Sequence, residues 1–414
     1  MLDSKHINSL ISQFKKSNLF IDSESHLHFY DFDVLHQNMV SVSNVFPANW
    51  SHAVAIKTNP LNGILSEISA FGFQLEAASV NEVLLASKSH KGTIIWDSPI
   101  KKNTEIEAVS KLENRIIINA NSLHELQLLS PFFNYPNLSF GLRINPQADS
   151  RSDKSMDVGN RYSKFGEPIS NLEQVKDFFK SSKQTLGLHI HSSSQSFDIT
   201  PMVNNIRVLL DVIESWKKEN IEIKYLDIGG GLGVNYEVQN TSILVDYFEA
   251  LSIACPSLFE KLDFEIFTEF GRFYHAYAGF SLSVIEEVKK FKTHQTIIQH
   301  FGAENFLREC YQPTMWPHRI NILNQNLKTN DNQFISSDVA GSLCFGGDYI
   351  AKNLNLPETE IGDYCLIMDT GANSYALWSM HCSQLMPRII GIKGNEFSVL
   401  KEAQTFSDLE NFWQ

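Results

Sequence analysis

Cysteine is scarce in this sequence and follows neither a disulfide nor a metal-binding pattern. The 414 residues include only five cysteines, an odd number, and no two of them form a C-x-x-C pair. Disulfide frameworks and structural zinc sites need paired or regularly spaced cysteines, so we expect neither, and no other metal site is predicted.

Long apolar runs are lacking as well. No stretch approaches the ~20 apolar residues that span a bilayer. The N-terminal segment MLDSKHINSLISQFKK is amphipathic and has no uninterrupted apolar run of the kind found in signal peptides. The sequence therefore predicts a cytoplasmic protein without a membrane partner.

Basic residues are outnumbered, with 34 Lys and Arg against 47 Asp and Glu and a net charge of -13. The charge is spread along the chain, and no basic cluster is interleaved with aromatic residues, so a nucleic-acid partner is not expected. Four Lys-Lys pairs are interpreted as solvated ends of helices or strands: Lys15–Lys16, Lys101–Lys102, Lys217–Lys218 and Lys289–Lys290.

Alternating strand-like and helix-like segments dominate the first two thirds of the chain. From about residue 50, short β-branched runs alternate with segments whose apolar residues recur at helical spacing. The pattern predicts an α/β fold with a (β/α)8 barrel over residues 45–280, and a doubly wound open sheet is the alternative. The eight predicted strands are residues 53–56, 73–77, 93–97, 115–119, 138–144, 186–190, 223–228 and 264–269.

The texture changes after about residue 280, where strand-like stretches are broken by Gly, Pro and Asn without strong helices between them. We expect residues 281–414 to form a second, mostly β domain, of a β-sandwich or barrel-like kind. The N-terminal segment 1–44 contains a predicted strand at residues 25–31 that could pair with this later sheet. The polar stretch 148–164 is predicted to be a loop over the barrel mouth.

Chemically capable side chains follow the predicted barrel strands, where the active site of such a barrel is built. In chain order they are Lys57, Glu76, Ser79, Asp97, Asn119, Arg143, His189, Ser192, Gly229, Gly230, Gly231, Glu269 and Arg272.

Four features among these residues have more than one interpretation from the residues alone. Lys57, at the end of the apolar run AVAI, is either a surface residue or an amine placed in a pocket. The three glycines of LDIGGGLG form either a phosphate nest or a plain tight turn. Glu269 needs a cationic partner such as Arg272 or a proton donor. For His189 a flat neutral ring is favoured over a zinc ligand, because no third ligand has the required spacing.

Seven motifs together resemble, in order and spacing, the fold type III pyridoxal phosphate (PLP) enzymes of the ornithine/diaminopimelate/arginine decarboxylase family. They are AIKTNP, EAASVNE, HIHS, DIGGG, EFGR, GSLCFGGD and DTGAN, and the resemblance runs from about residue 25 to 390. It implies a PLP-binding (β/α)8 barrel joined to a β domain, and a homodimer whose active sites are shared between subunits.

The resemblance also implies roles for the residues that match the motifs. Lys57 would form the Schiff base with PLP, helped by desolvation that lowers its affinity for a proton. Glu269 would face the pyridine nitrogen, where alanine racemases of the same fold carry a cation, so a glutamate favours decarboxylation. Cys344 of the other subunit would return a proton to the substrate Cα. His189 would stack on the cofactor ring, Glu76 and Arg143 would lie close to the cofactor, and Ser192, Gly229, Gly230, Gly231 and Arg272 would hold its phosphate.

Two departures from the family pattern bear on the substrate. The acidic residue that follows the cysteine in the family is Phe345 here, so nothing at this position can pair with a distal ammonium group. The tyrosine expected to contact the phosphate is Asn373, with Tyr375 two residues on as a possible substitute. The residues expected near the substrate are Arg308, Tyr311, Phe345 and Asp348.

The sequence therefore predicts a PLP-dependent decarboxylase that removes the α-carboxylate of an amino acid or amino-acid conjugate, and not of a simple diamine precursor. The alternatives are a PLP-dependent racemase and a catalytically impaired regulatory homologue of the decarboxylases.

Overall fold

The computed structural model describes residues 4–148, 158–237, 242–260 and 262–414. The chain divides into a barrel unit, residues 38–234 and 240–273, and a β unit, residues 1–37, 235–239 and 274–414. Of the loop predicted at 148–164, residues 149–157 lie outside the described part of the chain.

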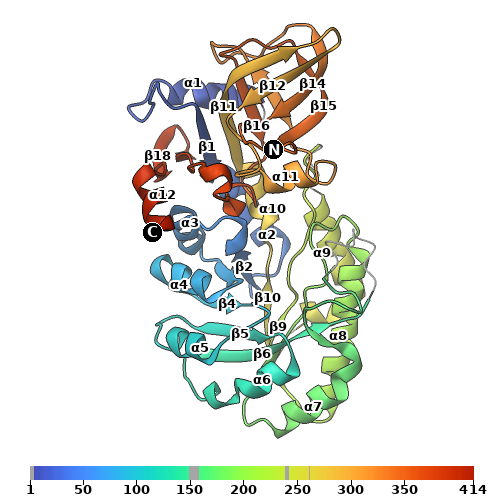
Figure 1. The fold of residues 1–414 in the computed structure, drawn as a ribbon. Helices are drawn as coiled ribbons and strands as arrows, with labels where there is room; N and C mark the ends of the chain where they lie inside the picture. Colours follow the sequence, from blue (N-terminus) through green and yellow to red (C-terminus); the bar gives the residue numbers. More distant parts are fainter. Residues whose placement is uncertain (1–3, 149–157, 238–241, 261) are drawn as a thin grey trace. The chain divides into compact units, whose positions relative to one another are not determined.

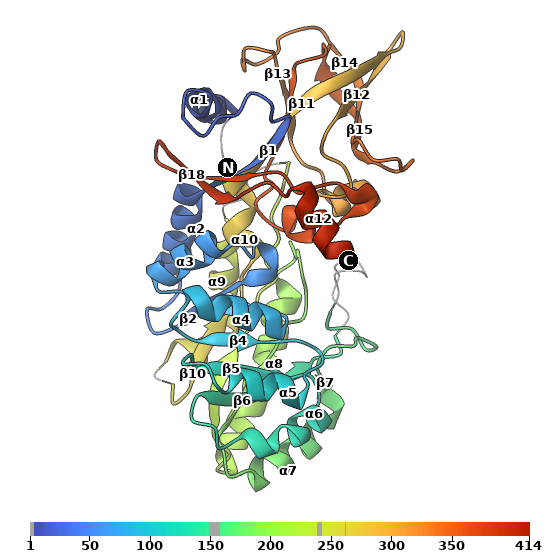
Figure 2. The ribbon, with the colours of Figure 1, turned by 60° about the vertical axis from the view of Figure 1, so that its left-hand side comes forward.

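The barrel unit is a closed ring of eight parallel strands. Figures 1 and 2 label several of them, among them β2, β4, β5, β6 and β10. The ring closes because β5 pairs with β6 and β10 pairs with β2, which excludes the open-sheet alternative. All eight predicted strands are confirmed, with ends that differ by one or two residues. They are β2 (Ser51–Ala55), β3 (Gln74–Ala77), β4 (Ile94–Trp96), β5 (Ile116–Ala120), β6 (Leu138–Asn145), β8 (Leu186–His189), β9 (Ile223–Asp227) and β10 (Glu265–Thr268).

Helices follow the barrel strands along the chain, and Figure 2 shows α4 and α5 beside β4 and β5. The first turn of α4 is fixed by its cap, since the Ser79 hydroxyl accepts from the Glu82 N–H and the Glu82 carboxylate accepts from the Ala78 N–H. The helices of this unit include α3 (Asn62–Phe71), α4 (Val80–Ser89), α5 (Asn103–Val109), α6 (Leu123–Leu128), α7 (Leu172–Ser181), α8 (Thr200–Lys218) and α9 (Ile243–Ala254).

One aromatic side chain, Tyr225, fills much of the barrel interior. A Cβ atom at Gly141 or Gly187 would lie 2.3 or 2.2 Å from the Tyr225 side chain, so both positions require glycine. The Tyr225 hydroxyl donates to Asn119 Oδ1 at 2.6 Å. The interior is thus closed by packed side chains, and the polar groups lie toward the carboxyl ends of the strands.

The β unit contains a nine-stranded sheet to which the N-terminal strand belongs. The strand β1 (His26–Asp31) pairs antiparallel with β11 (Gly279–Lys290) and parallel with β17 (Ile389–Lys393), as the sequence predicted for residues 25–31. The other strands are β12 (His294–Gln299), β13 (Ile320–Leu323), β14 (Phe334–Ala340), β15 (Tyr349–Pro357), β16 (Tyr364–Met368) and β18 (Glu396–Lys401).

The strand-like stretches predicted in this part of the chain are residues 281–291, 296–301, 318–323, 364–368 and 396–400, so β14, β15 and β17 were not predicted. The strands β14 and β15 carry serine and asparagine at several positions and alternate poorly between buried and exposed residues. The strand β17 is short and interrupted by Gly391. Helices flank the sheet in sequence: α1 (Ser4–Phe14), α2 (Phe32–Val45), which runs on into the barrel unit, α10 (Arg272–His275), α11 (Leu307–Tyr311) and α12 (Phe406–Trp413).

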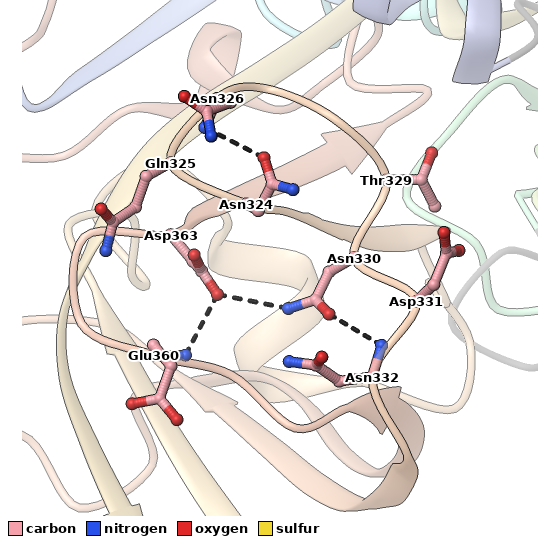
Figure 3. Close-up of a pocket in the computed structure, with 9 residues that line it drawn as sticks. All are labelled: Asn324, Gln325, Asn326, Thr329, Asn330, Asp331, Asn332, Glu360 and Asp363. Atoms are coloured by element: carbon pink, nitrogen blue, oxygen red, sulfur yellow. Dashed lines mark hydrogen bonds between the residues drawn. The ribbon is translucent and has the colours of Figure 1, made fainter.

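A polar cavity of about 510 Å³ lies among the asparagine-rich turns of the β unit (Figure 3). Its side chains bond to one another: Asp363 Oδ2 accepts from Asn330 Nδ2 at 3.3 Å and from the Glu360 N–H at 3.1 Å. These bonds hold the turns together. None of the helices in the described ranges combines the length and apolar character that crossing a bilayer requires.

Candidate active site

Lys57 lies directly after β2, in a short 3-10 turn of residues Ile56–Thr58. Its Nζ donates to Glu76 Oε2 at 2.6 Å, and the lysine side chain is 50% exposed whereas that of Glu76 is 1% exposed. Burial opposes the lysine charge, but the carboxylates of Glu76, Glu269 and Asp97 outweigh it and raise the pKa of Lys57. The expectation that desolvation makes Lys57 lose its proton more readily is therefore wrong for the chain without cofactor.

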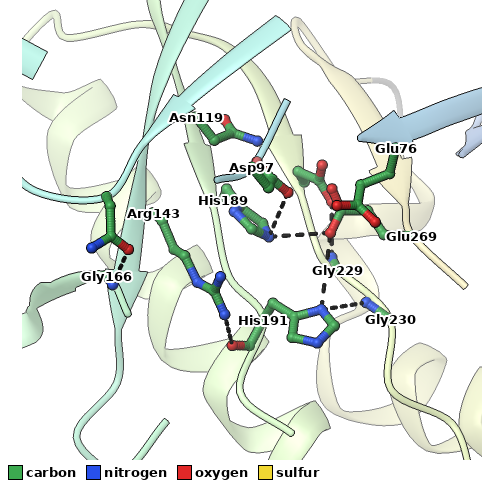
Figure 4. Close-up of polar contacts among 12 residues, drawn as sticks. Glu76, Asp97, Asn119, Arg143, Gly166, His189, His191, Gly229, Gly230 and Glu269 are labelled. Carbon is green, nitrogen blue, oxygen red and sulfur yellow. Dashed lines mark hydrogen bonds and ion pairs between the residues drawn. The ribbon is translucent and has the colours of Figure 1, made fainter. Parts of the chain in front are cut away.

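His189 lies between two carboxyl groups, as Figure 4 shows. Its Nε2 is 3.3 Å from Glu269 Oε2 and 3.7 Å from Asp97 Oδ2, and all three side chains are buried. Burial lowers the pKa of His189 to about 4, so the imidazole is neutral at pH 7 despite its acidic neighbours.

The glycine turn after β9 packs tightly against the neighbouring strand ends. A Cβ atom at Gly230 would lie 2.2 Å from the Glu269 carbonyl oxygen, and Gly229 and Gly231 have φ angles of 68° and 112°. The Gly229 N–H donates to Asp227 Oδ1, and the Gly230 N–H donates to His191 Nδ1. Two of the three amides are thus engaged within the protein, and close packing alone requires glycine here.

Two cations near the strand ends, Arg143 and Lys101, donate to backbone carbonyls. Arg143, on β6, donates from Nη2 to the His191 carbonyl at 2.9 Å (Figure 4). Its guanidinium lies over the Phe165 ring. The prediction that Lys101 is a solvated strand or helix end is wrong. Its Nζ is buried and donates to the carbonyls of Ser98 and Asn119, both at 2.7 Å, because the β4–α5 loop folds this side chain inward.

The remaining predicted barrel residues are also buried near the strand ends. Ser192 is 7% and Arg272 9% exposed, and Arg272 begins α10. Asp227, at the end of β9, lies with these residues but was not among the predicted site residues, although its place two residues before the glycine run was a usable signal.

In the β unit, the predicted substrate residues fall into two groups. Phe345 stacks on Tyr311 with ring centroids 5.6 Å apart and lies 5.7 Å from the His381 ring. Cys344 is exposed beside them. Arg308 lies one helical turn from Tyr311 on α11, with its guanidinium over the Trp316 ring.

Asp348, Asn373 and Tyr375 occupy more internal positions of the β unit. The Asp348 carboxylate accepts from the N–H groups of Ala303 and Leu343, and it is 3% exposed, so it supports the backbone of the Cys344 loop. Asn373 has a left-handed φ of 57°, which asparagine tolerates better than most residues. Tyr375 is buried, with its ring centroid 4.9 Å from that of His28.

Comparison with known proteins decides the family. The profile of the family described as pyridoxal-dependent decarboxylase, pyridoxal binding domain, matches residues 33–276, which is more than half of the chain. The chain belongs to the pyridoxal-dependent decarboxylases. The resemblance inferred from the seven motifs is thereby confirmed.

Similar decarboxylases are found in several bacteria. The chain is 26% identical to the diaminopimelate decarboxylase of Helicobacter pylori (strain J99), over 96% of this chain and 97% of that one. It is 27% identical to the enzyme of the same name from Campylobacter jejuni, over 92% and 94%. A crystal structure of a variant of the Helicobacter pylori enzyme complexed with L-lysine superimposes with a TM-score of 0.85 at 25% identity, covering 95% of this chain and 97% of that one.

The residues at the barrel mouth fit the PLP of this family. Lys57 offers an amine on a half-exposed side chain, and Glu269 Oε1 is a buried acceptor without a hydrogen-bond partner among the described residues. A protonated ring nitrogen is a suitable partner for such an oxygen. This decarboxylase is a PLP-dependent carboxy-lyase that acts on an amino acid.

Proposed function

We propose that this decarboxylase removes the α-carboxylate of an amino acid or amino-acid conjugate that is not a simple diamine precursor. The proposal rests most directly on Glu269, a buried acceptor at the end of β10 on the same side of the barrel as the Lys57 amine. PLP, when bound, supplies an electron sink for the electron pair left on the substrate when CO2 departs.

The barrel residues would hold the cofactor by complementary charge and shape. Lys57 would bind its aldehyde through Nζ, and Glu269 would accept a hydrogen bond from its ring nitrogen. The neutral His189 ring would lie against the cofactor face, with Arg143 nearby. Ser192, Gly229, Gly230, Gly231 and Arg272 would bind the phosphate, after the engaged glycine amides exchange their present partners.

Two residues are placed to move protons in this proposal. Glu76 accepts the hydrogen bond of Lys57 Nζ at 2.6 Å and can take its proton, because burial raises the pKa of Glu76 while the lysine charge opposes this. The exposed Cys344 thiol would return a proton to the substrate Cα. We propose that it does so from the other subunit of a homodimer with shared active sites.

The proposed substrate preference depends on Phe345. Its ring contacts the rings of Tyr311 and His381, and neither of these two side chains carries a carboxylate for a distal ammonium group. Ornithine and lysine each need such a partner, so an apolar or planar distal group suits this aromatic cluster better. Arg308 is the proposed contact for an anionic distal group. The Asp348 carboxylate accepts from backbone N–H groups, so in this proposal it supports the loop and does not bind the substrate.

Diaminopimelate is a second candidate substrate, since the curated relatives that cover almost the whole chain bear its name. The deciding experiment measures CO2 release from diaminopimelate, ornithine, lysine and their N-acyl conjugates. We expect release from a conjugate and little from ornithine or lysine. Efficient turnover of ornithine or lysine by the wild type would contradict the proposal, and turnover of diaminopimelate alone would favour the second candidate.

Substitution of Phe345 tests the aromatic cluster directly. Phe345→Glu restores an acid and should shift preference toward substrates with a distal ammonium, whereas the matched control Phe345→Leu should not. The same assays in deuterated water test for racemisation. If deuterium enters unreacted substrate and no CO2 is released, the enzyme is a racemase and not a decarboxylase.

A further inference from the structure

Three carboxyl groups meet at one place in the barrel, and the proposed function accounts for one of them. Asp97 follows β4, Asp227 ends β9 and Glu269 follows β10. One oxygen of each lies within 4.8 Å of the other two and of a His189 ring nitrogen. The side chains of Asp97 and Glu269 are 6% and 4% exposed, and Asp227 is fully buried. We call these three residues the carboxyl cluster.

The carboxyl cluster receives few hydrogen bonds from the rest of the described chain. Both oxygens of Asp97, Asp227 Oδ2 and Glu269 Oε1 are buried without an N–H or O–H donor among the described residues. The remaining Asp227 oxygen accepts from the Gly229 N–H. Asp97 and Asp227 each bring one carboxyl oxygen within 4.8 Å of an oxygen of the Glu269 carboxyl. Such an approach is favourable only when one of the two carboxyl groups carries a proton.

The neighbouring cations are directed elsewhere. Lys57 pairs with Glu76, Lys101 donates to backbone carbonyls and to Glu125, and Arg143 donates to a backbone carbonyl. The charged or titratable groups that face Asp97 are Lys57 after β2, Glu76 on β3, Lys101 after β4, Arg143 on β6, His189 on β8, Tyr225 and Asp227 on β9, and Glu269 after β10.

We propose that Asp97 is a positioning residue that carries a proton shared with Glu269 in the chain without cofactor. The proton replaces repulsion between two buried carboxylates by a hydrogen bond and holds Glu269 and His189 in place at the barrel mouth. The inference rests on the proposed function only in assigning Glu269 to the cofactor's ring nitrogen.

The pKa of Asp97 is consistent with a proton held between Asp97 and Glu269. Burial, and after it the neighbouring Glu269 carboxylate, raise the pKa of Asp97 to about 7. An aspartate whose folded-state pKa is raised contributes stability at low pH that is lost as the pH rises toward that value. The window for this loss therefore runs from about pH 4 to pH 7.

The test compares thermal unfolding of the full chain, stripped of PLP, between pH 5 and pH 8 for the wild type and Asp97→Asn. The melting temperature of the wild type, relative to Asp97→Asn, should fall by about 2–4 °C per pH unit up to pH 7 and then level off. The control is Asp246→Asn, an exposed aspartate on α9 of the same unit, which should follow the wild type. Parallel profiles for the wild type and Asp97→Asn would overturn the proposal.

A second variant keeps the proposal testable if Asp97→Asn does not fold. Glu269→Gln removes the partner charge, so Asp97 should ionise at lower pH and the slope below pH 7 should shrink. An unchanged slope in Glu269→Gln would also overturn the shared proton. Borohydride trapping of PLP on Lys57 of the PLP-loaded chain tests the proposed function separately from the shared proton. Failure of trapping would contradict the proposed function, but it would not affect the unfolding result for the chain without PLP.

Discussion

At the scale of single residues, Lys101 was predicted to be solvated, but it is buried and supports the active site. Its ammonium donates to the carbonyls of Ser98 and Asn119 on two neighbouring strand ends. Lys101→Met should destabilise the chain by about 1–3 kcal/mol, because both buried carbonyls lose their donor. Urea unfolding of this variant against Lys102→Met, an exposed neighbour, measures the effect. Equal stability of the two variants would show that the bonds contribute nothing.

The charge of Glu269 can be tested without a change in shape. Glu269→Gln keeps the side-chain volume but removes the negative charge proposed to keep the cofactor ring protonated. We expect decarboxylation to fall about 10²- to 10³-fold while Lys57 still retains PLP. CO2 release together with borohydride trapping gives both values. Loss of trapping would instead assign Glu269 to cofactor binding, and full activity would remove it from the mechanism.

Residue patterns predicted the local chemistry better than they predicted side-chain direction. Lys57, Glu76, His189 and Glu269 lie together as expected, because the carboxyl ends of parallel barrel strands converge. The inward turn of Lys101 was not predictable, since nothing in a Lys-Lys pair distinguishes the lysine that a loop folds into the core. The raised pKa of Lys57 was missed because it depends on the sum of carboxylates from three other strands.

At the scale of elements, short apolar runs predicted every barrel strand, whereas the serine-containing β14 and the asparagine-containing β15 were not predicted. Hydrophobic periodicity reports burial on one or both faces, and these strands bury little of either. The sequence could not distinguish a closed barrel from an open sheet. The pairing of β5 with β6 closes the barrel, and the residues of neither strand alone predict that pairing.

The glycine turn after β9 links three strand ends, so a single methyl group there should disturb them all. Gly230→Ala would place a Cβ atom 2.2 Å from the Glu269 carbonyl oxygen, which forces the β9 and β10 ends apart. We expect a loss of about 1–3 kcal/mol in stability and weaker PLP retention. Denaturant unfolding and cofactor titration measure both. Gly346→Ala, with open space around its Cβ position, is the control for stability, and equal behaviour of the two would contradict the packing argument.

At the scale of the whole molecule, the proposed catalytic groups belong to different units of the chain: Lys57 and Glu269 to the barrel unit and Cys344 to the β unit. If each active site joins Lys57 of one subunit to Cys344 of another, two inactive variants should complement one another. Lys57→Ala mixed with Cys344→Ala should regain about a quarter of wild-type activity, since half of randomly assorted dimers carry one intact site of two.

The complementation experiment needs subunit exchange, so the two variants are unfolded together, refolded and assayed for CO2 release. Each variant refolded alone sets the background, and wild type treated in the same way sets the scale. Activity no higher than the sum of the two separate variants would contradict sites shared between subunits. In that case Cys344 must act within its own chain or has no part in proton return, and the activity remaining in Cys344→Ala distinguishes these two outcomes.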